Sequence, residues 1–460
     1  MPTRSYATRL PVSVEQAFAW HDRPGALERL SPPFLPAGVE RSDRSLAVGS
    51  EVVLRMGPTP LAPRWRARHI AYDPPHEFRD VQESGPFAAW DHRHRFEADG
   101  PDASVLTDEV HYRLPLGPLG DLVAGRFVGA TIDRMFAYRH RRTVADLAAH
   151  AAARQRGVRP MRIAITGSTG MIGEALTAFL TTGGHDVVRI VRSAGGDDTI
   201  HWDPDGGRIE AERLRGVDAV VHLAGEPIAA GRGAAHLERV RTSRERGTRL
   251  LAEALADLGQ DGPSVLVSSS ATGYYGDRGE EVLTEDAGPG DDVLAEVCVA
   301  WEQATAAAEE AGLRVVHVRT GVVQTPAAGA LAKLLPLFRL GLGGRLGSGR
   351  QYEAWVSLED VVGIFHHALT TPELSGAVNA TAPEAVTNAT YTATLARVLG
   401  RPALLPVPKV GPKLLLGELA EPMLYASQRV TPAVALASGY RFVHPNLEGC
   451  LRDMLGRPAA

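Results

Sequence analysis

The sequence predicts an α+β domain followed by a parallel, doubly wound α/β sheet with a small C-terminal subdomain. A length of 460 residues suits two or three domains, each with its own core. Strand-like runs followed by one long helical pattern precede residue 156, whereas short β-branched runs alternate with helical stretches after residue 160. The first order is typical of an α+β layer, and the second of a parallel sheet with helices on both faces.

The first part contains strand-like runs that Gly and Pro residues separate, at 51–56, 65–72 and 105–114. A long helix is expected after them, because several side chains recur at helical spacing. These are Val128, Ile132, Met135, Phe136, Thr143 and Leu147.

Residues 156–160 form the predicted linker, because Gly157 and Pro160 separate an Ala/Arg-rich helical end from a β-branched run. The predicted domains are therefore 1–155, 161–375 and a C-terminal subdomain, 376–460, that completes the substrate site. Strands of the second part are expected at 162–166, 186–191, 218–225, 264–270 and 314–321. Helices are expected to include 174–183 and 301–312.

The composition excludes several classes of partner. Hydrophobic residues make up 44% and charged residues 22% of the chain, and the net charge of -5 is spread over both signs, so no surface for nucleic acid is expected. Two cysteines, Cys298 and Cys450, cannot form a disulfide framework, which favours a reducing compartment. No run of about 18 uncharged apolar residues occurs. We therefore expect a soluble, cytoplasmic protein without a membrane partner.

Residues 161–175, MRIAITGSTGMIGEA, place three glycines between a strand and a helix. Glycines there let the backbone turn tightly and approach a pyrophosphate, and the helix N-terminus supplies free N–H groups. Strand, glycines, helix and second strand follow in the order of a Rossmann-type dinucleotide site, within about 30 residues. The cofactor-binding residues predicted here are Gly167, Thr169, Gly170, Met171, Ile172 and Gly173. A tight glycine turn without a ligand is the alternative.

The second strand run indicates which dinucleotide binds. An NAD enzyme usually has an acidic residue near this strand end for the ribose 2′-hydroxyl, whereas an arginine can bind a 2′-phosphate. This run ends in Arg192 and Ser193, and no acidic residue follows before Asp197. We therefore expect NADP, with Arg192 on its 2′-phosphate, and a solvated arginine is the alternative.

Six motifs follow one another between residues 166 and 355: TGSTGMIG, VVHLAGEPI, SSSATGYYGDRG, WEQAT, RTGVV and GLGGRLGSGRQYEAW. Together they resemble the extended short-chain dehydrogenase/reductase superfamily, and more narrowly its atypical, SDR39U1-like epimerase branch. Later stretches, such as GAVNATAPEAVTN and RPALLPVP, resemble the small domain that closes this branch. The resemblance covers about Met161 to Leu455. It implies an NADP cofactor, a small-molecule substrate, and Ala224, Gly225 and Thr320 in the cofactor site.

In that superfamily a strand-end serine bonds the substrate oxygen, and a YxxxK pair on the next helix transfers the proton. The lysine charge lowers the pKa of the phenol. Ser270, with Ser269 beside it, matches the serine. Alignment on Glu302 puts Leu294 and Cys298 where the tyrosine and the lysine should be, and no YxxxK occurs nearby.

The missing pair has two interpretations. Either another group donates the proton, with Tyr275 as the main candidate and Tyr274 beside it, or the domain binds NADP without the superfamily's chemistry. A tyrosine without a nearby cation keeps a pKa near 10, so it would be a poor base at pH 7 but could still donate a proton. The two tyrosines could also be wall residues. Cys298 is expected to be a small buried residue rather than a nucleophile.

A glycine-rich stretch near residue 350 is the predicted substrate loop. It supplies Arg350, Gln351 and Trp355, and such a loop can reach over the carboxyl ends of the strands. Arg350 is either an anion clamp or a solvated arginine. The family commonly has WIH where this chain has Trp355, Val356 and Ser357, so a histidine is absent here.

Residues 90–97 carry a periodic pattern in the first part. Trp90, His92, His94 and Phe96 alternate with charged residues and therefore share one strand face, which we expect to line a ligand cavity. No carboxylate or cysteine joins the two histidines at ligand spacing, and His69 and His111 are distant in sequence, so we expect a core or cavity wall and no metal.

Residues 10–33, residues 85–97 and the long helix together resemble the SRPBCC superfamily, with its START-like helix-grip fold. This resemblance implies a curved sheet and a long helix around an apolar cavity. An apolar or aromatic ligand is therefore expected in the first domain.

Two hypotheses for function follow. The first is an NADP(H)-dependent oxidoreductase or epimerase-like enzyme, in which Ser270 orients a substrate oxygen and Tyr275 supplies a proton. The second is a non-catalytic NADP(H)-binding sensor or scaffold joined to a small-molecule-binding domain. The intact glycine, serine and loop motifs favour the first, and the missing YxxxK favours the second.

Overall fold

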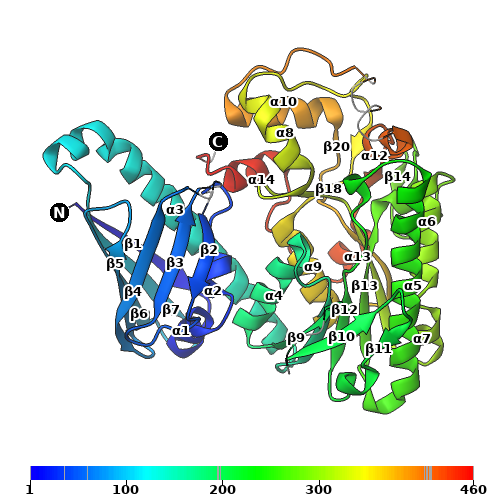
Figure 1. The fold of residues 1–460 in the computed structure, drawn as a ribbon, viewed down its shortest axis with the longest axis horizontal. Helices are drawn as coiled ribbons and strands as arrows, with labels where there is room; N and C mark the ends of the chain where they lie inside the picture. The colour runs from blue at the N-terminus through cyan, green and yellow to red at the C-terminus, as the bar shows by residue number, and fades with distance from the viewer. Residues whose placement is uncertain are drawn as a thin grey trace. The chain divides into compact units, whose positions relative to one another are not determined.

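The computed structural model describes residues 2–35, 37–57, 59, 61–193, 196, 198–408, 410, 413 and 417–458. It consists of two compact units (Figure 1). The first comprises Met1–Pro160, Ala178–Gly184 and Asp453–Pro458, and the second comprises Met161–Thr177 and His185–Arg452. Among the helices of these described ranges, none combines the length and the apolar character that a membrane span requires.

The first unit contains a seven-stranded antiparallel sheet in the order β1-β7-β6-β5-β4-β3-β2. Its strands are β1 (Thr3–Leu10), β2 (Ala37–Ser42), β3 (Glu51–Met56), β4 (Arg64–Asp73), β5 (Glu77–Ser84), β6 (Ala89–Ala98) and β7 (Ser104–Arg113). Its helices are α1 (Val14–Asp22), α2 (Ala26–Leu30) and the 38-residue α3 (Pro118–Gln155). The α+β layer that the sequence predicts is present, and its three predicted strand runs are β3, β4 and β7.

The predicted core face of α3 is confirmed. Its predicted side chains are buried at Ile132, Met135, Phe136, Thr143 and Leu147, and half-buried at Val128. Phe136 packs with residues of β6 and β7, whereas Leu147 packs with α1. The alternation on β6 is confirmed as well, because all four side chains of the predicted inner face are buried.

The second unit contains an eight-stranded sheet in the order β11-β10-β9-β8-β12-β13-β15-β19. All neighbouring strands are parallel except β11, which pairs antiparallel with β10. The strands are β8 (Arg162–Thr166), β9 (Asp186–Val191), β10 (Thr199–Asp203), β11 (Arg208–Ile209), β12 (Ala219–His222), β13 (Val265–Ala271), β15 (Arg314–Thr320) and β19 (Gly376–Ala380). The doubly wound parallel sheet predicted from the sequence is thus confirmed.

Helices cover both faces of this sheet, with α4 and α9 on one face and α5, α6 and α7 on the other (Figure 1). The bounds are α4 (Met171–Gly183), α5 (Ala234–Leu258), α6 (Val293–Gln303), α7 (Ala306–Glu310), α8 (Gly329–Arg339), α9 (Leu358–Thr370), α10 (Asn388–Leu399), α12 (Ala420–Leu424), α13 (Ala433–Ala437) and α14 (Leu447–Met454). Short 3-10 turns are η1 (Ala211–Leu214), η2 (Ile228–Ala230), η3 (Gly259–Asp261), η4 (Thr272–Tyr275) and η5 (Gly417–Leu419). Leu251 and Leu255 of α5 pack on Val220 and Leu266 of the sheet and form the centre of its core.

Three small sheets lie beside the main one. They are β14 (Val282–Leu283) with β21 (Arg429–Val430), β16 (Val322–Gln324) with β18 (Trp355–Ser357), and β17 (Tyr352–Glu353) with β20 (Val386–Thr387). The main sheet extends past residue 375, since β19 begins at Gly376, where the sequence-based boundary of the C-terminal subdomain lies.

A buried aspartate on α9 binds the C-terminal segment. Asp360 is 0% exposed, and its carboxylate accepts hydrogen bonds from the backbone N–H groups of Val443 at 2.7 Å and His444 at 3.0 Å. The hydroxyl of Ser357 donates to the same carboxylate at 2.6 Å and also caps α9 by accepting from the Asp360 N–H. Ser357, which stands at the family's histidine position, is therefore a helix cap in this chain.

Candidate functional site

The candidate site of the second unit begins where the strand order reverses, between β8 and β12. Thr166 ends β8 and lies opposite His222 of β12, and a 2.8 Å hydrogen bond joins their side chains. The Thr166 hydroxyl also accepts from the N–H groups of Leu223 at 3.0 Å and Ala224 at 3.2 Å. After β8 the chain passes to α4 on one face of the sheet, and after β12 it passes to α5 on the other face. In open parallel sheets this reversal is where ligands bind.

The glycine loop between β8 and α4 has no room for side chains at two positions. Gly167 has φ 64°, and a Cβ atom there would lie 2.9 Å from the backbone nitrogen of Ala224. At Gly173 a Cβ atom would lie 2.2 Å from the Gly167 carbonyl oxygen. The Ser168 hydroxyl is buried and has no hydrogen-bond partner among the described residues. Close backbone packing and an unpaired buried donor fit an approaching pyrophosphate.

The other predicted cofactor residues of this loop surround the first turn of α4. Thr169 and Gly170 are exposed, and Met171 and Ile172 are half-buried at the start of the helix. The N–H of Glu174 donates to the Gly170 carbonyl at 2.8 Å, so the helix begins within the loop. The loop and the N-terminus of α4 therefore form one surface.

The remaining predicted cofactor residues also follow the carboxyl ends of parallel strands. Ala224 and Gly225 come directly after β12, and Thr320 ends β15. Arg192 comes directly after β9 with an exposed side chain, and the part of the chain that the structure describes offers its guanidinium no ion pair. Asp197 lies outside the described residues. The fold thus brings these residues to one edge of the sheet.

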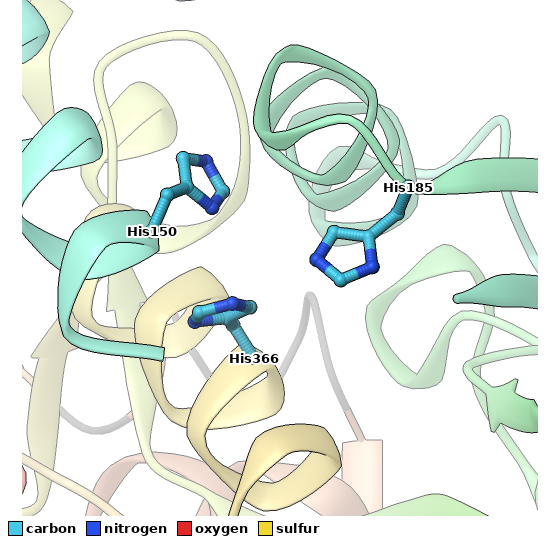
Figure 2. Close-up of side chains that lie close together, drawn as sticks. All are labelled: His150, His185 and His366. Carbon is cyan, nitrogen blue, oxygen red and sulfur yellow. The ribbon is translucent and has the colours of Figure 1, made fainter. Parts of the chain in front are cut away.

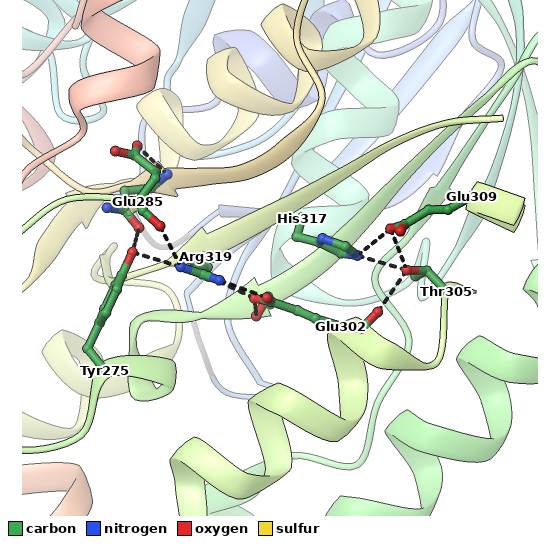
Figure 3. A network of polar contacts seen from close by, with 9 residues as sticks. Tyr275, Glu285, Glu302, Thr305, Glu309, His317 and Arg319 are labelled. Atoms are coloured by element: carbon green, nitrogen blue, oxygen red, sulfur yellow. Dashed lines mark hydrogen bonds and ion pairs between the residues drawn. The ribbon is translucent and has the colours of Figure 1, made fainter. Parts of the chain in front are cut away.

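Ser270 of β13 bonds to a buried polar network that includes Glu302 of α6 and Arg319 of β15. Figure 3 shows Glu302, Arg319 and Tyr275 of this network. The Ser270 hydroxyl donates to the Glu302 carboxylate at 2.7 Å. The same carboxylate forms a two-pronged ion pair with Arg319, at 2.8 Å for both Nε and Nη2. Side-chain exposure is 6% for Arg319 and 12% for Glu302. Since Ser270 already donates to a carboxylate, its oxygen remains available only as an acceptor.

Tyr275 is at the far end of this network and is 0% exposed. Its hydroxyl donates to Asn379 Oδ1 at 2.7 Å and accepts from Arg319 Nη1 at 3.1 Å. Burial raises the pKa of this phenol, and the neighbouring Arg319 only partly offsets that effect. Tyr274 is half-buried, and the Arg319 guanidinium carbon lies 3.5 Å from its ring centroid. The structure therefore holds Tyr275 as a neutral, hydrogen-bonded phenol, and its role as proton donor stays a prediction.

The positions that match YxxxK carry apolar side chains. Leu294 is 7% exposed and Cys298 is 5% exposed on α6. Burial raises the pKa of the Cys298 thiol to about 12, with a further contribution from Glu302. A thiol with so high a pKa is not a nucleophile at neutral pH, which agrees with the packing role expected for Cys298. Ser269, the serine beside Ser270, is also buried at 9% exposure.

The three predicted substrate residues differ in their surroundings. Arg350 is exposed and lies 3.7 Å from the exposed Glu280. Gln351 is buried and donates to the carbonyls of Leu346 and Leu424, while Trp355 is buried and donates to the Glu384 carbonyl at 2.8 Å. Gln351 and Trp355 thus bind backbone in this structure, whereas Arg350 presents its charge to solvent. Their substrate roles stay predictions.

Two buried arginines were not predicted as part of the site. Arg319 of β15 is the cation next to Tyr275, and it is paired with Glu302. Arg244 of α5 is 8% exposed, donates to the carbonyls of Glu226 and Val240, and stacks on Trp301 at 4.8 Å. The RTGVV motif was a signal for Arg319, since it places an arginine at the end of a buried strand. Arg244 gave no signal, because its helix is rich in charged residues.

A histidine pair of the second unit lies away from this site. His185 directly precedes β9 and His366 is on α9, and their ring centroids are 6.0 Å apart (Figure 2). His185 Nδ1 also accepts from the backbone N–H of Met161, next to the start of β8. The pair therefore lies at the amino ends of the strands, the opposite edge from the glycine loop.

The first unit contains a partly open cavity of about 210 Å³. His92, His94 and Trp90 of β6 line it, as the sequence predicts. The expectation that no carboxylate joins the two histidines is wrong, because strand pairing places Asp80 of β5 opposite His92 and Asp108 of β7 opposite His94. His69, on β4, is close to the two histidines in space. It lies opposite Asp80 of β5 and lines the same cavity. Asp80, Asp108 and His69 could not be predicted as neighbours of His92 and His94, because they lie on other strands of the sheet.

Comparisons with known proteins agree with this fold. Residues 163–380 match the NAD dependent epimerase/dehydratase family, and residues 407–454 match a domain of unknown function, DUF1731. The epimerase family protein Mb2239 of Mycobacterium bovis is 43% identical over 298 residues, which cover 64% of this chain and 98% of that protein.

Two solved structures are also similar. The nucleoside-diphosphate sugar epimerase from Corynebacterium glutamicum has a TM-score of 0.81 and 34% identity, covering 98% of this chain and 90% of that chain. The human epimerase family protein SDR39U1, solved with NADPH, has a TM-score of 0.59 and 35% identity, covering 64% of this chain and 99% of that chain. The fold, the glycine loop and these similarities place the chain in the NAD dependent epimerase/dehydratase family.

Proposed function

We propose that the second unit binds NADP(H) and acts as an oxidoreductase or epimerase-like enzyme on a small organic molecule. The glycine loop carries this proposal, because Gly167 and Gly173 leave the backbone open to a pyrophosphate and the buried Ser168 hydroxyl lacks a partner. The human relative solved with NADPH supports the same cofactor. Arg192 would bind the 2′-phosphate that distinguishes NADP from NAD.

In this enzyme the cofactor would supply or accept a hydride, and the chain's own residues would hold the substrate. Ser270 donates to Glu302, so it would orient a substrate hydroxyl by accepting its hydrogen. Tyr275 would supply the proton, which requires its bond to Asn379 to open. Arg350, exposed beside Glu280, would bind an anionic group of the substrate.

A second candidate function is a non-catalytic NADP(H)-binding sensor or scaffold. Its support is the burial of Ser270 and Tyr275, whose hydroxyls already donate to Glu302 and Asn379. The apolar pair Leu294 and Cys298 at the YxxxK positions adds to that support. Turnover of a substrate separates the two functions.

Arg192→Ala should lower the preference for NADPH over NADH by about 10- to 100-fold, because a charge-assisted hydrogen bond to the 2′-phosphate is lost. Fluorescence titration with each cofactor measures this preference. Arg208→Ala is the matched control, since Arg208 is an exposed arginine on β11 of the same sheet. An unchanged preference in Arg192→Ala would rule out the assignment of the 2′-phosphate site.

Tyr275→Phe should separate enzyme from sensor. If Tyr275 donates the proton, loss of its hydroxyl should reduce NADPH oxidation by about 10²- to 10⁴-fold at unchanged NADPH affinity. Absorbance of NADPH with a panel of carbonyl compounds gives the rate. In either case Asn379 Oδ1 loses its donor, so the variant should also unfold about 1–3 kcal/mol more easily. Tight NADPH binding by the wild type without any turnover would favour the sensor.

We further propose that the first unit is an SRPBCC, START-like helix-grip domain that binds an apolar or aromatic molecule. Support comes from the seven-stranded sheet with its long helix α3 and from the cavity of about 210 Å³, whose wall includes Leu54, Trp65 and Met135. Failure of the full chain to take up an apolar fluorescent dye would remove this support.

The sequence, with two cysteines, favours a reducing, cytoplasmic location.

A further inference from the structure

Three side chains on paired strands of the first unit form a cluster of metal-ligating type. Asp80 of β5 lies directly opposite His92 of β6, and His94 follows on the same face of β6. One ligand atom from each residue lies within 4.8 Å of the other two. All three line the cavity, so the cluster combines a carboxylate, two imidazoles and an open side.

His92 and His94 each have one ring nitrogen near the Asp80 carboxylate and the other near the Asp108 carboxylate. His92 Nδ1 and His94 Nε2 face Asp80, at 3.4 and 3.9 Å from its Oδ1. Their other nitrogens face Asp108, with His92 Nε2 at 3.1 Å and His94 Nδ1 at 2.6 Å from its Oδ1. His140 Nε2 donates to the second Asp108 oxygen at 2.7 Å. Asp108 therefore orients both imidazoles toward Asp80.

This arrangement matches the outer partners of known metal sites. A histidine that binds a metal through one nitrogen usually bonds a carboxylate or carbonyl through the other, which fixes the ring. Asp108 has that place for His92, through a hydrogen bond of 3.1 Å, and His94 Nδ1 lies 2.6 Å from the same oxygen. It is 2% exposed, so its charge needs compensation from the groups around it.

The contacts on the Asp80 side are longer than those on the Asp108 side. Ligand bonds of about 2.0–2.1 Å at a tetrahedral metal place neighbouring donor atoms roughly 3.3 Å apart. The separation of 3.4 Å from Asp80 to His92 Nδ1 is close to that value, and the separation of 3.9 Å to His94 Nε2 is longer.

A fourth imidazole faces the same cluster. His69 of β4 is paired with Asp80 in the sheet and lines the cavity. Its Nδ1 is buried without a hydrogen-bond partner among the described residues, and His69 is 9% exposed. A buried nitrogen without a partner beside a carboxylate fits an absent water or ion.

We propose that Asp80, His92 and His94 bind a divalent transition-metal ion of the Zn²⁺ or Fe²⁺ type. Two imidazoles and one carboxylate form a ligand set that these ions accept, and it leaves coordination positions open. The open side faces the cavity, so an oxygen or nitrogen atom of a cavity ligand, or His69, can complete the shell. The first unit is then a metal-containing binding site rather than a purely apolar one.

Zinc titration of the chelator-treated full chain tests the proposal. We expect Asp80→Asn to weaken the binding of one equivalent of Zn²⁺ by at least about 100-fold, because a charged ligand is lost, and Asp108→Asn to weaken it by about 10- to 100-fold. His76→Gln is the matched control, since His76 is an exposed histidine of the same unit. Calorimetry gives the affinities, and far-UV circular dichroism checks the folds.

X-ray absorption of the wild type loaded with one equivalent of Zn²⁺ needs no variant. Two or more imidazoles in the first shell would support the site. Fewer than two, or equal Zn²⁺ affinity in wild type and a folded Asp80→Asn, would overturn it.

Discussion

Arg319→Met should lower the midpoint of thermal unfolding by about 10 °C. The substitution leaves Glu302 without its guanidinium partner at 12% exposure, and breaking a buried ion pair from one side costs about 3–5 kcal/mol. It also removes the donor to the Tyr275 hydroxyl and the cation over the Tyr274 ring. Differential scanning calorimetry of the full chain measures the change.

The double variant Glu302→Leu with Arg319→Met is the matched control. It removes both charges, so no unpaired carboxylate is left, and it should recover most of the lost stability. Ser270 then loses its acceptor, but a hydroxyl can turn toward a backbone carbonyl. If the double variant is no more stable than Arg319→Met, the stability that Arg319 provides does not come from its ion pair with Glu302.

Gly173→Ala should reduce NADPH affinity by at least about 100-fold, because a methyl group would displace the backbone that approaches the pyrophosphate. The new Cβ would lie 2.2 Å from the Gly167 carbonyl oxygen and 2.7 Å from Ser168 Cα, both of them backbone atoms that cannot rotate away. The loop must therefore shift. Fluorescence titration with NADPH measures the loss.

Gly170→Ala is the control within the same loop. Its Cβ would meet only the Gly167 carbonyl oxygen, at 3.3 Å, so a shift of a few tenths of an ångström suffices. We expect it to keep affinity within a few-fold of the wild type. Equal losses in Gly170→Ala and Gly173→Ala would mean that the effect comes from helix stability and not from the close contact at Gly173.

The parallel sheet and its nucleotide-binding edge could be predicted, because short stretches of sequence indicate them. Strands β8 and β13 each contain a short apolar run, at 163–165 and 265–267, and the glycines of residues 167–173 directly follow β8. The extension β10 and β11 was not predicted, because it is short: β10 has five residues that alternate between half-buried and buried, and β11 has two. The stretch that becomes β19 resembles the small C-terminal domain in sequence, whereas in the structure it pairs with β15 at the edge of the main sheet.

The partners of the site residues could not be predicted, since they come from distant strands and helices. Glu302 was used only to align a motif, yet its ion pair with Arg319 holds Ser270. In the first unit, the period of β6 predicted the buried face correctly. Asp80 and Asp108 join that face only through the register of β5 and β7, which depends on the whole antiparallel sheet.

The bonds of Asp360 bear on where this chain can be divided. Two separate family matches, 163–380 and 407–454, suggest two independent modules. Yet Asp360 lies in the first match, and the N–H groups that satisfy its buried carboxylate belong to Val443 and His444 in the second. A gene fragment ending after the first match would encode a protein whose Asp360 keeps the Ser357 hydroxyl but loses the backbone donors of Val443 and His444. Recombination between relatives should therefore exchange both matches together, as a single heritable block.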